Sequence, residues 1–513
     1  MKLRIVFAIT GLVLLATDRT FAQSYAEEAL MISRMRPGGS ARIQSMGGVQ
    51  TSLGGDISSA YYNPAGLGMY NRSEISFTPG YVISNSDASY LGNTTSANKT
   101  NLIFPNFGIA LHTNKDGSKG LWGGTFAINY NRTNDFNNTV TYKGRNTDNS
   151  IIDYFISDAN GTGTSQFDVN GFNYNTPTGL SYFNYLIGPQ SILTPPGPNN
   201  QYFTDVSGIP DQTETIKTTG SQSQWSFSYG VNFNDKIFVG GGIGFASFHY
   251  RSEKVYSESF ADAGQPMTNL QLNETLNLSG SGINATLGAI FRPVDRFQVG
   301  LSIATPTSYQ ISDNYTASMQ TTWNHFEYLP GDPANNIPPT ILDNESASTD
   351  QLTDSYNLSN PWRLSGGFTF FFEKKGFISA DLEWLDYSTA KYSSSSIYGG
   401  DYSGDNQQIK NLYQSVLNIR AGGEYRLKNF RFRGGFALLP DPFKNQQNNV
   451  DRSISSYSAG VGYRTSNFYI DFAAIMSQEN NSYRPYTINS SLSPLVGLKN
   501  SASSFIVTVG FPF

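Results

Sequence analysis

The chain has 513 residues, a formal net charge of −5 and no cysteine, and aromatic and charged residues each make up 14% of it. The lack of cysteine excludes a disulfide scaffold, a cysteine-ligated zinc site, a thiol nucleophile and a lipoprotein anchor. With only three histidines, the chain has few side chains suited to metal binding or acid–base catalysis. Its net negative charge does not indicate the basic surface that nucleic-acid binding requires.

The N-terminus has the features of a secretory signal peptide, predicted over residues 1–22. Lys2 and Arg4 precede a short apolar stretch, and Thr20–Ala22 offers a small-x-small cleavage site. We therefore expect the mature chain to begin at Gln23 and to leave the cytoplasm. The apolar stretch is too short for a spanning helix, and no later segment has 18 uncharged apolar residues, which excludes a helical membrane protein.

Residues 23–73 show no strand pattern. Residues 25–36 could form a short helix, and a glycine-rich stretch follows that includes Asn63-Pro64-Ala65-Gly66-Leu67. Pro64 lacks a backbone donor and biases Asn63 away from helix, and Gly66 permits conformations that are closed to other residues. The motif predicts a sharp bend that either moves on ligand binding or serves as a rigid turn.

The rest of the chain alternates repeatedly between apolar and polar residues, which is typical of strands with two different faces. Residues 225–233, for example, alternate aromatic and aliphatic residues with serine, glycine and asparagine. Small polar residues opposite bulky aromatics suit a barrel with a lipid-facing wall and a polar interior. A soluble sandwich would alternate too, but its polar face would carry more charge.

Fourteen strands are predicted. They lie at residues 74–84, 101–113, 121–134, 223–234, 236–257, 268–292, 297–315, 351–373, 376–393, 411–427, 430–440, 452–466, 468–480 and 502–513. The connections after even-numbered strands are tight and those after odd-numbered strands are long, the longest at 136–222. This alternation predicts an all-β protein, a 14-stranded antiparallel transmembrane β-barrel over residues 74–513 with short periplasmic turns and long extracellular loops.

Two further expectations follow from a barrel of this size. Its lumen is too wide for its own side chains to fill, so residues 23–73 are predicted to form an N-terminal hatch that plugs it. The terminal Phe513, preceded by aromatics at alternate positions, fits an insertion signal read by the outer-membrane assembly machinery.

Alternation turns a set of charged residues of predicted strands eight to eleven inward. They are Arg363, Asp381, Glu383, Arg420, Glu424, Arg426, Arg431 and Arg433. Charges of both signs on adjacent strands can pair across a sheet, and we expect this ladder to hold the hatch through residues such as Arg42, Asp56 and Glu74. The alternative is that Arg420 or Arg433 clamps a substrate carboxylate.

The predicted 136–222 loop contains two apolar stretches, residues 151–156 and 182–187. Ile152, Phe155 and Ala159 lie at helical spacing. Long loops of this size tend to be functional or disordered. The stretches could line an apolar groove that captures ligand at the barrel mouth, or they could form a lid packed on neighbouring loops.

Several motifs resemble a known family. Ser40–Arg42 with Met46–Gly48, Asp56–Ala60 and Asn63–Leu67 resemble the N-terminal hatch of the FadL/OmpP1/TodX family of outer membrane transport proteins. Asn360–Arg363, Gly376–Ser388 and Asn418–Tyr425 resemble the middle strands of Bacteroidetes-type members. The resemblance spans most of the mature chain but is dense only in these blocks.

The resemblance implies an outer membrane channel for passive uptake of hydrophobic small molecules, such as long-chain fatty acids or aromatic hydrocarbons. It also implies capture at an outer groove, a lumen pocket above the hatch and lateral exit through a gap in the wall into the membrane lipid. The alternative is a FadL-like barrel that binds protein partners in secretion or surface attachment. A polar diffusion channel fits less well because of the hatch. No catalytic motif, cofactor or metal site is predicted.

Overall fold

The computed structural model describes residues 25–114, 120–168, 171, 173–189, 201–395, 400–488 and 493–513. The predicted signal peptide, its cleavage site and Gln23 lie outside this part of the chain. Within the described ranges, no helix combines the length and the apolarity that membrane crossing requires.

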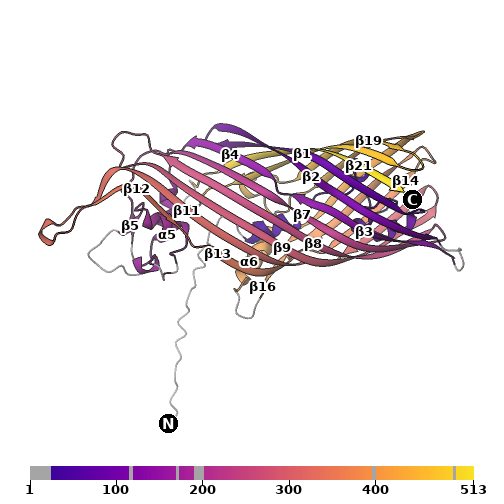
Figure 1. Cartoon of the computed structure of the whole chain (residues 1–513), viewed down its shortest axis with the longest axis horizontal. Helices are drawn as coiled ribbons and strands as arrows, with labels where there is room; N and C mark the ends of the chain where they lie inside the picture. Colours follow the sequence, from indigo (N-terminus) through magenta and orange to yellow (C-terminus); the bar gives the residue numbers. More distant parts are fainter. Residues whose placement is uncertain are drawn as a thin grey trace, which may run out of the picture.

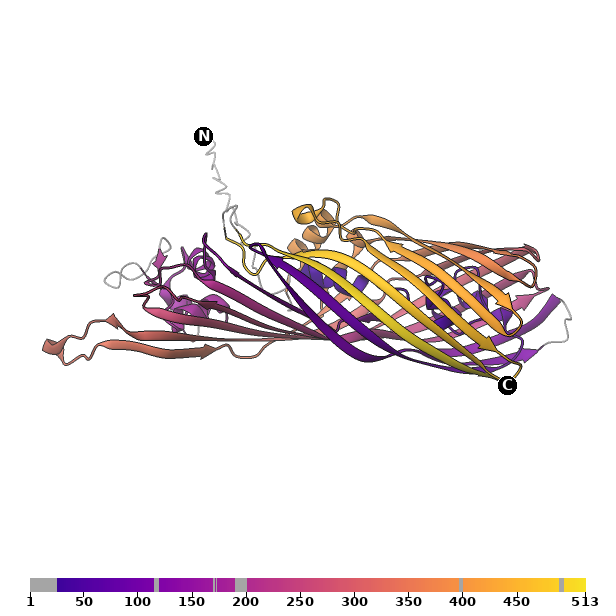
Figure 2. The same ribbon diagram turned by 90° about the horizontal axis from the view of Figure 1, so that it is seen from above.

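The strands form a closed antiparallel barrel with fourteen strand positions, which confirms the predicted fold class (Figures 1 and 2). Closure comes from the pairing of the first strand with the last, from Glu74↔Pro512 to Ser89↔Gly497. In chain order the positions are β1 (Glu74–Tyr90), β2 (Asn93–Asn114), β3 (Leu121–Asp135) with β4 (Asn138–Arg145), β7 (Asp211–Phe233), β8 (Ile237–Ser259), β9 (Met267–Val294), β10 (Phe297–Ala304) with β11 (Ser308–Leu329), β13 (Leu352–Ser359) with β14 (Arg363–Phe371), β15 (Gly376–Asp386), β17 (Ser415–Leu427), β18 (Phe430–Leu439), β19 (Ile454–Arg464), β20 (Tyr469–Tyr483) and β21 (Val496–Pro512).

The barrel wall is apolar outside and polar inside, the reverse of a water-soluble protein. In β7, the side chains of Phe227 and Tyr229 are 39% and 50% exposed on the outer face, whereas Ser226 and Ser228 are 2% and 1% exposed inside. Alternate residues of a strand point to opposite faces, so the alternation of the sequence becomes the two faces of the wall.

The strands extend well beyond the predicted limits at one end of the barrel. β1 and β2 are joined by the two-residue hairpin loop Leu91-Gly92 at the end where long loops were predicted, so residues 85–90 and 93–100, predicted as a connection, are strand. β4 likewise pairs with the first part of β7, which places strand in the predicted 136–222 loop. The prediction was wrong in these residues because the outward side chains are polar there and give no signal of a lipid-facing wall, although Tyr90, Val140 and Tyr142 pack together on the inner face.

The long-loop end, defined as the end opposite the tight turns, carries a small folded cap. Ile151–Ala159 forms α4, as its helical spacing predicts, and Ser150 and Asp153 complete a capping box at its start. The other parts of the cap are η3 (Thr164–Gln166), α5 (Pro177–Phe183) and the short pair β5 (Gly188–Pro189) and β6 (Tyr202–Phe203). The apolar residues that could have lined a capture groove are buried in the core of the cap, among them Ile152, Phe155 and Leu186.

The remaining elements are short and lie in the connections of the long-loop end. They are β12 (Thr340–Ser348), which pairs with β11 in a protruding hairpin, β16 (Lys391–Ser394), α6 (Ser403–Leu412), η4 (Pro333–Asn335), η5 (Tyr387–Thr389) and η6 (Gln447–Asn449) (Figure 2).

The N-terminal segment, residues 25–73, lies inside the barrel (Figure 2, indigo). It consists of α1 (Tyr25–Ser33), α2 (Ala41–Gln44), α3 (Ser59–Tyr62) and η1 (Pro64–Met69), joined by glycine-containing turns. Buried side chains of all four elements, such as Ile32, Ile43, Ala60 and Leu67, pack on the inner face of the wall.

Candidate functional site

The Asn63–Leu67 motif forms a bend that is fixed to the wall by its first residue. Asn63 is fully buried and caps η1, because its side-chain oxygen accepts a hydrogen bond from the Ala65 amide at 3.1 Å. Its side-chain nitrogen donates to the Thr51 carbonyl at 2.6 Å and to the Leu301 carbonyl of β10 at 3.2 Å. The bend is therefore tied both to the N-terminal segment and to the barrel.

Glycines of the wall allow the segment to approach the strand backbones. At each of them an added Cβ would overlap an atom of the segment; at Gly240 it would lie 2.6 Å from the Ala65 nitrogen. At Gly230, Gly240, Gly300, Gly422 and Gly435 the overlapped atoms belong to the backbone of the segment, which cannot swing aside, so a side chain there would push the segment away. At Gly108, Gly288 and Gly460 they belong to side chains of the segment, and we call these eight residues the wall glycines.

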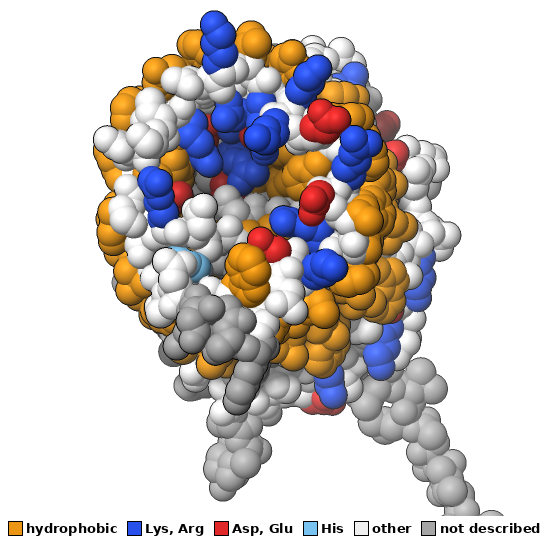
Figure 3. All heavy atoms as spheres, turned by 90° about the vertical axis from the view of Figure 1, so that its right-hand side faces the viewer, with side chains coloured by type: hydrophobic (Ala, Val, Ile, Leu, Met, Phe, Trp, Pro, Cys, Tyr) orange, Lys and Arg blue, Asp and Glu red, His pale blue; other side chains and the backbone are white. Residues whose placement is uncertain are grey.

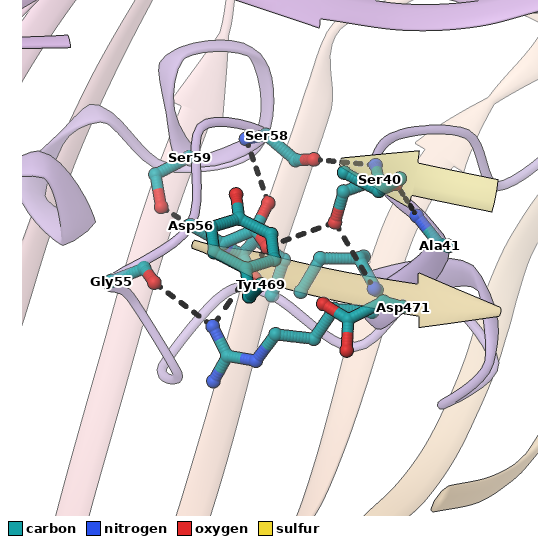
Figure 4. Close-up of polar contacts among 12 residues, drawn as sticks. Ser40, Ala41, Gly55, Asp56, Ser58, Ser59, Tyr469 and Asp471 are labelled. Carbon is teal, nitrogen blue, oxygen red and sulfur yellow. Dashed lines mark hydrogen bonds and ion pairs between the residues drawn. The ribbon is translucent and has the colours of Figure 1, made fainter. Parts of the chain in front are cut away.

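A second set of contacts holds the segment's own turns together (Figure 4). The Ser40 hydroxyl donates to Asp56 at 2.8 Å, and the other carboxylate oxygen of Asp56 accepts from the Ser58 amide at 3.0 Å. Arg42 donates to the Gly55 carbonyl at 2.9 Å. These contacts fold residues 40–58 into one unit that faces Tyr469 and Asp471 of β20.

Arg42 also joins this unit to the buried charges of the wall. Its Nε lies 3.7 Å from Glu424, which accepts from Arg433 at 2.8 Å and from Arg426 at 2.7 Å. Arg433 in turn donates to Asp471 at 2.6 Å, and the side chains of this last pair are only 1% and 2% exposed. Each arginine of the network thus has a carboxylate partner.

Two other ladder residues contact the backbone and the tyrosines of the segment. Asp381 accepts hydrogen bonds from the amides of Gln50 and Thr51 at 2.7 and 2.8 Å. Arg363 donates to the Tyr61 hydroxyl at 2.9 Å. An aspartate side chain of β15 therefore satisfies two amides that the segment leaves free inside the barrel.

Arg420, the candidate carboxylate clamp, is already paired. It donates to Glu383 at 2.8 Å, and its guanidinium lies 5.7 Å from the ring centre of Tyr62. The space beside Arg420 and Glu383 has a volume of about 10 Å³, room for about one water molecule.

Helix α1 closes one side of the lumen through a cluster of tyrosines. The ring of Tyr25 lies 5.1 to 5.4 Å from those of Tyr356, Tyr392 and Tyr402. Glu28 of α1 accepts hydrogen bonds from Tyr356 and Tyr392 at 2.9 and 3.1 Å. Burial raises the pKa of Glu28 to about 8, although these hydrogen bonds act in the opposite direction.

A cavity of about 320 Å³ opens on the other side of the lumen. Its floor includes Arg36, Gly38 and Gly47 of the N-terminal segment, and its walls come from β1, β2, β3 and β18 to β21. Arg36 donates to Glu479 at 2.8 Å at this floor. This is a ligand-sized space inside the barrel, bounded on one side by the N-terminal segment.

The cavity borders a part of the wall where two strands are not hydrogen-bonded. The ladder between β2 and β3 ends at Asn106↔Asn131. Beyond it, β2 pairs with β1 and β4 pairs with β7, and no ladder between β2 and β4 is present among the described strands. We call this stretch the seam; side chains cross it, such as Lys99, which reaches the Thr218 carbonyl at 3.1 Å.

The structure brings the sequence-derived candidates together only in part. The Asn63–Leu67 bend and the inner charges contact the same N-terminal segment, but Arg431 lies at the tight-turn rim, where its hydrogen bonds go to backbone carbonyls. Basic side chains gather around this mouth of the barrel (Figure 3). Among the described residues, no group of three or more His, Cys, Asp and Glu could hold a metal ion.

Several residues of the site were missed from the sequence. Alternation alone would have turned Asp471 inward, because its neighbour Phe472 is a bulky apolar residue of the predicted strand 468–480, and Glu479 lies on the same face eight residues later. Glu28 and Arg36 gave no comparable signal, since they lie outside the predicted strands and their partners lie hundreds of residues away along the chain.

The chain matches known proteins both in sequence and in fold. The family described as outer membrane protein transport protein (OMPP1/FadL/TodX) matches residues 190–511. A FadL homologue from Pseudomonas aeruginosa superimposes with a TM-score of 0.53 and 12% identity, over 94% of this chain and 100% of that chain. The P. putida toluene transporter TodX gives 0.51 and 10%, over 93% and 99%. No curated protein matches the chain by sequence.

Proposed function

The chain belongs to the OMPP1/FadL/TodX family of outer membrane proteins that transport hydrophobic compounds, and we propose that it takes up hydrophobic small molecules passively through the cavity and the seam. Ligands of the long-chain fatty acid or aromatic hydrocarbon type are the starting expectation from the family. The observation that carries the proposal is the 320 Å³ cavity, which lies between the N-terminal segment and an unpaired stretch of the wall.

The N-terminal segment is the hatch in this proposal. This role is supported by the wall glycines, which let the segment pack closely against the strands. Side chains of the wall alone would not fill a lumen of this width. The tight-turn end of the barrel faces the periplasm and the capped end faces outward, as is usual for outer membrane barrels.

The inner charges serve as the anchor of the hatch rather than as a substrate clamp. Arg420 and Arg433 are each paired with a buried carboxylate, and Asp381 and Glu424 contact the segment directly. A ligand carboxylate at either arginine would have to displace a protein carboxylate that is already in place, which favours the anchoring role.

The seam between β2 and β4 is the lateral exit. Only side chains bridge it, so opening it would break no backbone ladder. Ile103 of β2 and Thr133 of β3 line the cavity on the two sides of this stretch. A ligand that reaches the cavity can therefore pass between them into the surrounding lipid without crossing the hatch.

Cross-linking across the seam tests this route, and a chain without native cysteine suits the method. We expect the pair Ile103→Cys and Thr133→Cys, joined by a short bifunctional thiol reagent, to abolish uptake of labelled fatty acid or toluene into proteoliposomes. The control pair, His112→Cys and Thr125→Cys, joins two residues that lie opposite each other in the hydrogen-bonded part of the β2–β3 ladder. Its cross-link should leave uptake unchanged. Full uptake through the cross-linked seam would contradict lateral exit; no uptake by the unmodified protein would contradict the function itself.

A further inference from the structure

The cavity has a mixed lining: more of its exposed surface is apolar than polar, but neutral polar side chains are frequent in it. Half of its described lining residues carry neutral hydroxyl or amide side chains, among them Ser84, Asn85, Asn138, Ser456, Asn500 and Ser501. Binding sites for hydrocarbons are mostly apolar with a few polar groups. A hydrocarbon here would remove these groups from water without offering them hydrogen bonds, which is unfavourable.

The charged residues of the lining do not suit a carboxylate. Arg132 lies 3.2 Å from Asp135, and Arg36 lies 2.8 Å from Glu479. Both arginines of the described lining are therefore neutralised by the protein, and a free fatty acid would bring its negative charge close to two carboxylates. Without a free cation to balance it, burial of that charge is costly.

Two buried polar groups of the lining lack a partner. The hydroxyl of Thr133, a residue that is only 4% exposed, makes no hydrogen bond, and neither does Nε of its neighbour Arg132. Buried polar atoms are nearly always hydrogen-bonded. The hydroxyl and the N–H thus lie just behind the cavity surface without a protein partner, and the head of a ligand that displaced the atoms covering them could accept from the N–H and donate to or accept from the hydroxyl.

Part of the apolar lining lies on the strands that border the seam, and the rest includes Ile475 of β20 and Ala502 of β21. Val82 belongs to β1, Ile103 and Pro105 belong to β2, and Phe136 follows the end of β3. A ligand with one polar and one apolar end would place its apolar end here and its polar end among the serines and asparagines of β19 to β21.

We propose that the cavity takes a neutral amphiphile whose head carries several hydroxyl or amide groups and whose alkyl tail points to the seam. This inference rests on the proposed function and names the class of ligand for the same site. An alkyl glycoside has this chemistry; a free fatty acid lacks the neutral head, and a bare hydrocarbon lacks any head. The tail would leave first through the seam, because lipid lies on its other side.

Equilibrium binding to the full-length protein in phospholipid nanodiscs tests the ligand class, with protein-free nanodiscs as the blank for partitioning. The probes are decyl glucoside, decanoate and toluene, and we expect the glucoside to bind most tightly. Thr133→Val keeps the shape and removes the unpartnered hydroxyl, so it should weaken glucoside binding about three- to tenfold and leave toluene unaffected. Thr113→Val, in the exposed part of β2, is the matched control and should change nothing.

A second variant reverses the preference. Asp135→Asn keeps the acceptor that the Asn137 amide uses but leaves Arg132 without its carboxylate, so it should strengthen decanoate binding at least severalfold. Tighter binding of decanoate or toluene than of the glucoside by the unmodified protein would overturn this inference and leave the proposed function standing. If the protein bound none of the three probes and supported no uptake, both proposals would fail.

Discussion

The inner face of the barrel is used in two different ways, and β19 shows both on one strand. Toward the tight-turn end its inward residues are Gly460, where an added Cβ would meet Ser45 of the N-terminal segment, and Gly462. Toward the long-loop end they are Ser456 and Ser458, which line the cavity. The wall thus lacks a side chain where it packs against Ser45 and carries small hydroxyls beside the cavity, where Ser458 also accepts a hydrogen bond from the Gly47 amide of the segment at 3.0 Å.

The charges follow the same division. In the region filled by the segment, carboxylates of the wall bind the segment directly, as Asp381 binds the Gln50 and Thr51 amides. Beside the cavity, Arg132 and Arg36 are neutralised and the Thr133 hydroxyl is unpartnered. Wall carboxylates therefore bind the segment's backbone in the filled region, whereas beside the cavity Glu479 pairs with the Arg36 side chain; unpartnered buried polar atoms occur in both regions, such as Asp381 Oδ1 and the Thr133 hydroxyl.

The largest effect is expected when a side chain is added to a wall glycine that packs against the N-terminal segment. Gly240→Ala would place a methyl group 2.6 Å from the Ala65 nitrogen, and backbone at this distance must move. Overpacking of this kind costs about 1–3 kcal/mol, and we expect the segment to lift from the wall and the barrel to conduct ions in planar bilayers.

The control for this variant is Gly434→Ala, whose added methyl group has its nearest neighbour at 3.9 Å. It should fold and remain closed. If Gly240→Ala stayed as closed as Gly434→Ala, the segment would not be the seal of the barrel.

The second effect concerns the charges that hold the segment. Glu424→Gln leaves Arg42, Arg426 and Arg433 without their shared carboxylate, and breaking a buried ion pair typically costs about 3–5 kcal/mol. Part of this loss is relieved because Asp56 and Asp471 still face two of the arginines. We expect faster hydrogen exchange in residues 40–58 and a lower midpoint of chemical unfolding.

A matched change at the surface separates burial from charge. Glu373 pairs with Arg296 at 3.1 Å, but both side chains are largely exposed, and exposed pairs contribute little. Glu373→Gln should therefore leave exchange in residues 40–58 unchanged. Equal effects of the two variants would mean that the buried network does not anchor the segment.

The third effect is a pH dependence in the docking of α1. The pKa of Glu28 is raised to about 8 from an ordinary value of 4.5, so the folded state favours the protonated carboxyl. Its contribution to stability is complete below pH 4.5 and is lost as the pH rises through 8. Exchange in residues 25–33 should accelerate over this range, and Glu28→Gln should abolish the acceleration.

The neighbouring Glu27 provides the control, because it is exposed on the same helix. Glu27→Gln should keep the pH dependence of the unmodified protein. Docking that is independent of pH in the unmodified chain would show that Glu28 is ionised in place, paired with a cation that the tyrosine cluster does not supply.

The sequence predicted those parts of the molecule that the membrane dictates. Lipid requires an apolar outer face, so Phe227 and Tyr229 alternate with Ser226 and Ser228, and the strand count follows. Beyond the lipid this requirement ends, and the β1–β2 hairpin was taken for a loop because its outer face is polar, although Ala88 and Tyr90 are buried on its inner face. Alternation also assigned Asp381 and Glu424 to the inner face.

Pairing between distant residues could not be predicted in the same way. Arg36 meets Glu479, and Glu28 meets Tyr356, only because the segment folds back into the barrel. The seam was not predicted, although Pro105 of β2 lies directly beyond the last pair of the β2–β3 ladder and has no backbone N–H to donate to it. The seam depends on how far each pair of strands stays hydrogen-bonded, and this pairing becomes known only in the folded barrel.

The smallest effect is expected in the cap, which tests whether the cap and the lumen are independent. Ser150→Ala removes the N-cap of α4, which typically costs about 1 kcal/mol, and also removes the hydroxyl that bonds buried Glu258. Exchange should rise in residues 151–159 while residues 40–58 stay protected, because the apolar core of the cap contains no residue of the N-terminal segment. Uptake should then be unchanged, because no described residue of the cap lines the cavity. Exchange that rose in both regions together would show that cap and segment unfold as one unit, and the division of the barrel into a plugged region and an open cavity would lose its meaning.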